Sequence, residues 1–268
     1  MAKENKVKKE VKVVTSPSQL PAELLDKLEQ HGNQGLSKSQ EDNLVPLVYI
    51  LQKQSPQVEE HDTRYIPGAK AADIWLRNAP NPIVKGSEGI LFQPCFFDVN
   101  WIEWIPRDHG GGFVARHTNP PEDANPFVDP QNPGRRKFLR PNGNEVIQTR
   151  NHIGFVLVNG KQPMPYVIPM TSSGHTISKN WMSDMNMRLL PSGKSAPSWA
   201  FIYRMKTRLR QNQYGSWFTW EINGERPVQD AAEFERGLRL FEAFNSGEKQ
   251  AETPQQEELV VEQAQDTM

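Results

Sequence analysis

Residues 199–222 read WAFIYRMKTRLRQNQYGSWFTWEI, and this stretch indicates both the class of fold and the chemistry of its surface. Successive side chains of a β-strand point to opposite faces, so residues two apart share a face. Over residues 199–210 this alternation separates aromatic and aliphatic side chains from four cations, Arg204, Lys206, Arg208 and Arg210. Residues 211–216 are typical of a turn, and residues 217–222 are typical of a return strand. The stretch therefore predicts a β-hairpin with one basic face.

The row of cations predicts an anionic ligand. Like charges two residues apart repel one another, and the predicted return strand offers only Glu221 as a counter-charge. Phosphates pair with Arg and Lys while unstacked bases lie on aromatic rings, so single-stranded nucleic acid fits a basic strand flanked by aromatics. Trp217 and Trp220 fall on opposite faces of the return strand, so one face packs into the core and the other is available for stacking. The sequence leaves both tryptophans as candidates.

Two further groups of cations are candidates for phosphate contacts. Arg135, Arg136, Lys137 and Arg140 lie near the end of a Pro/Asn-rich stretch, residues 118–143, that is predicted to form a long exposed loop. They fit either a phosphate clamp on that loop or an ordinary solvated loop. Lys179 follows the predicted start of a helix, where backbone amides can hold a phosphate.

The charge of the chain is segregated along its length. The formal net charge is −1, but residues 134–226 hold 14 Lys and Arg against 4 Asp and Glu. Residues 247–268 hold six acids and one lysine. The average therefore hides a basic body and an acidic tail.

Composition and pattern predict a mainly β fold of the β-rich α+β class. The 268 residues include 22 Pro and 18 Gly at a hydrophobic fraction of 36%, which favours many short elements joined by turns. We predict a flexible basic arm at residues 1–17, one domain at residues 18–245 and a disordered acidic tail at residues 246–268. Strands are expected within residues 43–51, 74–76, 89–105, 113–117, 153–158, 164–170, 199–210 and 217–222. Helices are expected near residues 18–31, 176–188 and 230–247.

This order of elements predicts a small, partly closed barrel with long loops. One helix is set between strands, and the other helices lie towards the ends of the chain. Among small barrels, the OB fold is the one whose sheet face and loops commonly bind oligonucleotides. An OB-like barrel is therefore the expected architecture.

The single cysteine and the absence of long apolar runs indicate the compartment. Cys95 cannot form an internal disulfide and supplies no zinc site, which favours a reducing cytoplasm. No run approaches the roughly 18 apolar residues that a membrane helix needs, and the basic start leads into no apolar signal core. We expect a cytoplasmic protein without a membrane segment, a metal or another cofactor.

An enzymatic interpretation rests on the residues around a glycine triplet at 110–112. His109 and His117 can approach each other across a hairpin and hold a metal with Glu103 or Asp108, as a metal-dependent nuclease requires. The turn alone explains the glycines, and no phosphate-binding loop, nucleophile elbow or paired-histidine helix is present in the sequence. We therefore predict that the protein is not an enzyme.

Four motifs carry a resemblance to a known family. They are EDNLVP at residues 41–46, YIPGAK at residues 65–70, EWIPRD at residues 103–108 and SKNW at residues 178–181. Together they resemble a family of tailed-phage single-stranded DNA-binding proteins associated with replication and recombination, over residues 35–222. The resemblance implies an OB-like fold and protection of single strands during replication in the cytoplasm of a bacterial host. It assigns no individual contact residue.

The acidic tail is similar to those of bacterial and phage single-stranded DNA-binding proteins, which dock replication partners. This tail ends in QDTM at residues 265–268, without the terminal aromatic or hydrophobic tip that such tails often carry. Docking of replication or recombination proteins is therefore not expected at its extreme end. Its charge instead suggests competition with DNA for the basic face.

The sequence thus predicts a non-enzymatic protein that binds single-stranded DNA through the basic hairpin. The main alternative is a protein-interaction or inhibitor module whose basic face meets an acidic partner or a replication enzyme. A metal-dependent nuclease is the third hypothesis.

Overall fold

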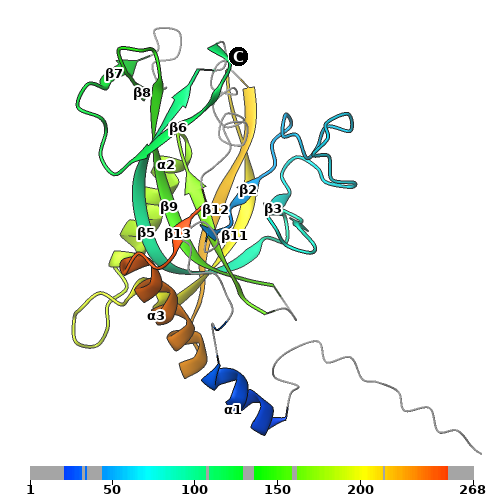
Figure 1. Ribbon diagram of the computed structural model, residues 1–268, viewed down its shortest axis with the longest axis vertical. Coiled ribbons are helices and arrows are strands. Elements are labelled where there is room, and N and C mark those ends of the chain that lie inside the picture. The colour runs from blue at the N-terminus through cyan, green and yellow to red at the C-terminus, as the bar shows by residue number, and fades with distance from the viewer. Residues whose placement is uncertain are drawn as a thin grey trace, which may run out of the picture. The chain divides into compact units, whose positions relative to one another are not determined.

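The structure is a computed structural model that describes residues 21–31, 34, 44–106, 109–128, 136–158, 162–213 and 215–252. Two units divide the chain, Met1–Asp42 and Asn43–Met268. The first unit contains α1, Ala22–Gln30, which matches the helix predicted near residues 18–31. All the strands of the described residues belong to the second unit (Figure 1).

Two long antiparallel strands, β5 (Ile90–Ile105) and β9 (Glu145–Leu157), form the centre of the main sheet (Figure 1). A register shift between Pro94 and Phe96 interrupts their pairing. Proline lacks the amide hydrogen that a ladder needs, and such a bulge bends a strand. Gly154 lies opposite, where an added Cβ would lie 2.1 Å from a backbone oxygen of β5, so only glycine allows this close approach.

Different strands flank the two halves of the central pair. On the β5 side, β11 (Phe201–Asn212) pairs with the first half and β6 (Gly112–His117) pairs with the second. On the β9 side, β10 (Met164–Met170) pairs with the second half and β8 (Arg136–Leu139) pairs with the start. The ends of the sheet are β12, Gly215–Pro227, and β7, Asn125–Val128.

The strands β10, β9, β5, β11 and β12 curl into a half-barrel, and the segment before Lys53 extends it. Leu47 bridges to Val167 of β10 in parallel. The side-chain amide of Gln52 donates to the Phe218 carbonyl and accepts from the Phe218 amide, both at 2.8 Å, so it replaces a strand neighbour for β12. Short strands complete this region: β1 Leu44–Val45, β2 Val48–Ile50, β3 Ile74–Leu76, β4 Ile83–Val84 and β13 Gln250–Ala251.

The strand order and the place of α2 confirm the predicted fold class. Helix α2 (Gly174–Asn186) follows β10 and precedes β11, and the β5 strand pairs with both β9 and β11. This is the arrangement of an OB-like, partly closed Greek-key barrel. The described residues are therefore mainly β, with a curled antiparallel half-barrel and three α-helices.

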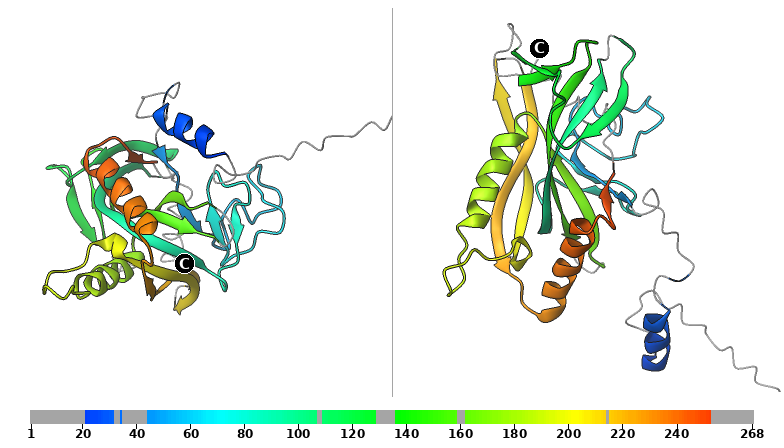
Figure 2. Two further views of the ribbon diagram at one scale, coloured as in Figure 1. Left: turned by 90° about the horizontal axis from the view of Figure 1, so that it is seen from below. Right: turned by 60° about the vertical axis from the view of Figure 1, so that its left-hand side comes forward.

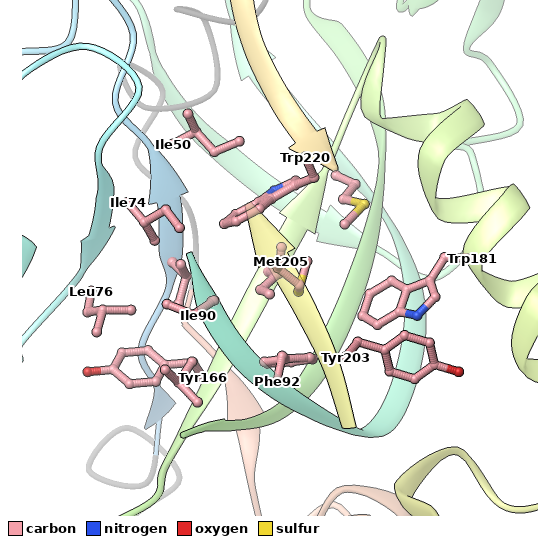
Figure 3. Close-up of a cluster of buried hydrophobic side chains, with 14 of the residues drawn as sticks. Ile50, Ile74, Leu76, Ile90, Phe92, Tyr166, Trp181, Tyr203, Met205 and Trp220 are labelled. Carbon is pink, nitrogen blue, oxygen red and sulfur yellow. The ribbon is translucent and has the colours of Figure 1, made fainter. Parts of the chain in front are cut away.

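The main core fills the half-barrel (Figure 3). Phe92, Tyr203 and Met205 are almost fully buried, and Trp181 of α2 packs edge-on against Tyr203 with ring centroids 5.3 Å apart. Burying side chains of this size is the main driving force for folding, because it removes apolar surface from water. Further members of this core include Val48, Ile50, Ile74, Leu76, Ile90, Val156, Tyr166, Ile168, Met170, Met185 and Trp220.

A second core lies on the outer side of the central pair, under α3 (Ala231–Asn245). Leu240 and Phe244 of this helix join a cluster with Cys95 and Ile153. The helix begins as the sequence predicts, since the Asp230 carboxylate accepts from the amide of Glu233 at 2.8 Å. Burial raises the pKa of Cys95 to about 12, which fits an inert core residue.

Two local expectations were wrong. Residues 118–143 do not form one long loop, because they contain β7 and β8. The return strand β12 does not end at residue 222 but continues to Pro227. The second difference changes the charge balance of the basic hairpin. The expected domain limits, with an arm at residues 1–17 and a tail at residues 246–268, fall mostly outside the described residues and stay predictions.

Candidate nucleic-acid interface

The β11–β12 hairpin extends beyond the half-barrel. Its two strands pair from Phe201 opposite Pro227 to Asn212 opposite Gly215. In the right-hand view of Figure 2, this yellow and orange hairpin and the green strands β6 to β8 reach the same end of the unit. The half of β11 nearest to the turn, residues 208–212, is exposed to solvent. The turn end of the hairpin is thus accessible to a ligand.

The cross-strand register assigns each aromatic side chain of β12 to a face. Trp220 lies opposite Thr207, on the face that carries Met205 into the core, and it is only 5% exposed (Figure 3). Trp217 lies opposite Arg210, on the face of the cations, and is half-buried. Of the two candidate tryptophans, only Trp217 is placed to stack on a base beside the cations. Trp220 is a core residue and does not belong to the interface.

The four cations of β11 differ in how far they are neutralised. Arg204 donates to both carboxylate oxygens of Glu225, at 2.9 and 2.7 Å, which lowers the pKa of Glu225. A two-pronged pair of this kind fixes the guanidinium and cancels its charge locally. The sequence did not reveal this partner, because Asn223 and Gly224 are typical of a turn and appeared to end the strand. Arg204 is therefore the least available of the four.

The remaining cations form an open basic surface, which we call the distal basic face: Lys206, Arg208, Arg210 and Trp217. Arg208 lies 3.9 Å from Glu221, with side chains 57% and 44% exposed, so that pair is loose and solvated. Among the described residues, Lys206 and Arg210 have no ion-pair partner. Three cations thus face one carboxylate, and the face keeps a net positive charge.

Residues far away in sequence hold the hairpin in place. Gln52 is buried and binds the backbone of Phe218 through its side-chain amide, whose NH2 group donates to the Phe218 carbonyl and whose oxygen accepts from the Phe218 amide. The adjacent Lys53 is exposed and donates to the hydroxyl of Ser216 at 3.1 Å, near the turn. Lys53 therefore adds a cation beside the hairpin that sequence reasoning missed. A single lysine in a loop carries no signal of such a placement.

The other predicted phosphate contacts are placed less favourably. Lys137 forms an ion pair with Glu145 and lies over the ring of Phe127, 5.4 Å from its centroid, so its charge is already engaged. Arg135 and the side chain of Arg136 lie outside the described residues. Lys179 is exposed on α2, on a different element from the hairpin. None of these residues joins the distal basic face in the part of the chain that the structure describes.

Two residues of the nuclease hypothesis, Glu103 and His117, belong to an ionic network. Glu103 is 1% exposed, and its oxygens bind Asn144 at 2.6 Å, His117 at 2.9 Å and Arg140 at 2.9 Å. Burial acts to raise the pKa of Glu103, but hydrogen bonds from Asn144, His117 and Arg140 outweigh it and hold this pKa below its usual value. Arg140 also pairs with Asp123 at 3.0 Å. Glu103 and His117 do meet, but an arginine shares the carboxylate, and Asp108 lies outside the described residues.

A buried polar chain connects α2 to the centre of the sheet. Arg150 donates through Nε to the Ser178 hydroxyl at 2.7 Å, and that hydroxyl lies 2.7 Å from Nε2 of His152. Burial, with the charge of Arg150 nearby, lowers the pKa of His152 to about 3. His152 is therefore neutral near pH 7 and accepts from Ser178. The side chains of His152 and Ser178 are buried. This series of hydrogen bonds therefore fixes α2 and offers no reactive group to a ligand.

Fold and surface together define a mainly β protein with an OB-like half-barrel and a basic hairpin. The family described as Pam3 phage gp34-like protein matches residues 14–250. The chain therefore belongs to the Pam3 phage gp34-like family and is a bacteriophage protein. No curated protein and no solved structure is significantly similar to it. No helix among the described residues is long and apolar enough to span a membrane.

Proposed function

We propose that this phage protein binds single-stranded DNA and protects it during replication or recombination. The observation that carries the proposal is the distal basic face, where three cations and Trp217 share one side of an exposed hairpin. Glu221 is the only carboxylate of the described residues that opposes these three cations. Phosphates neutralise the cations, and an unstacked base can lie on the indole ring. The face is a binding surface and needs no catalytic group.

The spacing of the cations along β11 also suits single-stranded DNA. Residues two apart on an antiparallel β-strand are separated by about 6.8 Å, so the three cations form an evenly spaced row along β11. Lys206, Arg208 and Arg210 can therefore each meet successive phosphates of an extended backbone. A flexible single strand adapts to this row, and its bases are free to turn towards Trp217.

The acidic C-terminal segment is proposed to regulate the same surface. Residues 253–268 lie outside the described residues, so the argument rests on their charge alone. An acidic segment competes with phosphates for the cations when salt is low, and bound DNA frees it for replication proteins. Deleting residues 253–268 should tighten DNA binding at low salt, and unchanged or weaker binding would reject the competition.

One titration separates the candidate functions. The full chain is added to a fluorescent oligothymidylate of about 20 nucleotides, and anisotropy is followed at several salt concentrations. Tight binding at low salt that weakens steeply with salt, a preference over duplex and no cleavage with Mg²⁺ or Mn²⁺ support the proposal. Absence of binding at low salt rejects it, and cleavage supports the nuclease hypothesis instead.

One observation favours a protein partner as the second candidate. Leu209 lies on the opposite face of the hairpin from the cations and is 53% exposed. A hairpin with one basic side and one apolar side also suits an acidic protein. Failure to bind any oligonucleotide, together with capture of an acidic replication enzyme, would establish this alternative.

A further inference from the structure

A pocket of about 270 Å³ opens between the β3–β4 region and the β9–β10 pair. Its floor is apolar and buried, with Leu76 at 4%, Val156 at 2% and Tyr166 at 1% exposure. Its mouth is exposed and carries the side-chain amides of Asn81 and Gln162. The pocket thus combines an apolar interior with hydrogen-bonding groups at the entrance, as ligand pockets do.

The hydroxyl of Tyr166 is an unsatisfied polar group at this pocket. It is buried and has no hydrogen-bond partner among the described residues. Figure 3 shows the hydroxyl end of Tyr166 turned away from Phe92 and towards the side of Leu76. Burial also raises the pKa of this phenol, so it stays protonated and can donate. A buried donor without an acceptor is rare in proteins and points to a missing partner.

The pocket favours a neutral ligand. Lys85 lies on its rim, but the ammonium group is bound by the carboxylate of Asp73 at 2.7 Å. Glu88 is the other charged residue of the lining. One engaged cation and one carboxylate leave no surplus positive charge for a phosphate. The ligand therefore has an apolar body and polar edges.

We propose that this pocket holds one unstacked nucleobase, an inference that rests on the proposed single-strand binding. A base is a flat ring that fits the apolar floor, and its ring nitrogens and carbonyl oxygens accept from the Tyr166 hydroxyl. Its edge also offers donors and acceptors to side-chain amides, the pairing that Asn and Gln make with bases. An aromatic protein side chain such as phenylalanine would leave the hydroxyl unpaired, so a base fits better.

The pocket and the distal basic face share one wall. Residues 85–89 connect β4 to β5, and Lys85 and Glu88 face the pocket. On the other side, the Gly86 carbonyl accepts from the amide of Thr207 at 3.1 Å, and Gly89 lies against the side chain of Lys206. A DNA strand whose phosphates contact the cations of β11 therefore passes next to residues 85–89. The pocket lies on the other side of these residues.

The test measures binding of free deoxynucleosides to the full chain by ligand-observed NMR, with indole as an apolar ring of similar size. Nucleosides should bind in preference to indole. The variant Tyr166→Phe should weaken nucleoside binding about fivefold, the usual effect of one hydrogen bond. The variant Ala79→Phe, which places a large side chain in the lining of the pocket, should abolish it. Tyr203→Phe is the matched control, since Tyr203 is equally buried but does not line the pocket.

Several outcomes overturn the base pocket. They are absence of nucleoside binding, equal binding to Tyr166→Phe and wild type, and indole bound as tightly as nucleosides. If Ala79→Phe fails to fold, the Tyr166→Phe comparison still decides. Oligonucleotide binding is measured in parallel. Absence of nucleoside binding by a wild type that still binds oligonucleotides rejects the pocket alone, whereas absence of oligonucleotide binding by the wild type rejects the proposed function.

Discussion

The strongest prediction contrasts two arginines of the same strand. Arg210 is unpaired among the described residues and lies on the distal basic face, whereas Arg204 is bound by Glu225. We expect Arg210→Gln to remove one phosphate contact. The matched control is the double change Arg204→Gln with Glu225→Gln, which removes a cation and its counter-charge together and leaves the net charge unchanged.

The size of the effect follows from counterion release. Each phosphate contact with a single strand contributes about 0.7 to the slope of log affinity against log salt. Raising the salt concentration from about 50 to 200 mM should therefore weaken the DNA affinity of the wild type about 2.6-fold more than the DNA affinity of Arg210→Gln. Removing Lys206, Arg208 and Arg210 together should lower the slope by about 2.1, an 18-fold difference over the same range. The double control should keep the wild-type slope.

Fluorescence anisotropy with labelled oligothymidylate at four salt concentrations gives these slopes directly. Circular dichroism of each variant verifies the fold. Two results would refute the reasoning. One is an unchanged slope for Arg210→Gln, and the other is a loss of slope in the Arg204 and Glu225 double variant as large as in Arg210→Gln.

Further predictions concern the supports of the hairpin and the core. Gln52→Ala should lower the free energy of unfolding by about 2 kcal/mol, since it removes two hydrogen bonds to Phe218, and a urea titration that gives no change would contradict this role. Trp220→Ala should lower the free energy of unfolding by about 3–5 kcal/mol because it empties a core site, whereas Trp217→Ala should weaken DNA binding by about 1–3 kcal/mol. Loss of stability in Trp217→Ala together with loss of DNA binding in Trp220→Ala would show that the core face and the binding face of β12 are exchanged. Because burial lowers the pKa of His152 to about 3, the unfolded chain binds a proton below about pH 6.5 that the folded chain does not. Stability should therefore fall as pH drops from about 6.5 towards 3, and thermal unfolding of the wild type across that range, with His152→Gln showing a flatter profile, measures it.

The sequence predicted those elements that depend on local pattern. The alternation over residues 199–210 placed four cations on one face of β11, and the structure has them there. Asp230 caps α3 as its position before an apolar helical face predicts. The helix between the β9–β10 hairpin and β11 was also evident from helical spacing. Together these elements were enough to predict an OB-like barrel.

Features that depend on tertiary contacts were not predictable. The choice between Trp217 and Trp220 depends on which face of β12 meets the core, which alternation alone does not fix. The pairing of Arg204 with Glu225 depends on a strand that continues through an Asn-Gly sequence, because the adjacent β11 holds it in the sheet. The clamp by Gln52 joins residues 166 positions apart. No local pattern encodes a contact of that kind.

The central claim is that DNA lies on the distal basic face, and photo-cross-linking tests its location most directly. The full chain is irradiated with an oligonucleotide that carries 5-iododeoxyuridine, digested with trypsin and analysed by mass spectrometry. Trypsin cleaves after Arg210 and Arg236 but not at the Arg226–Pro227 bond, so the peptide 211–236 reports on Trp217. We expect this peptide to carry the main cross-link, and Trp217→Ala to remove it. Efficient cross-linking confined to other peptides, with peptide 211–236 unmodified, would contradict the account.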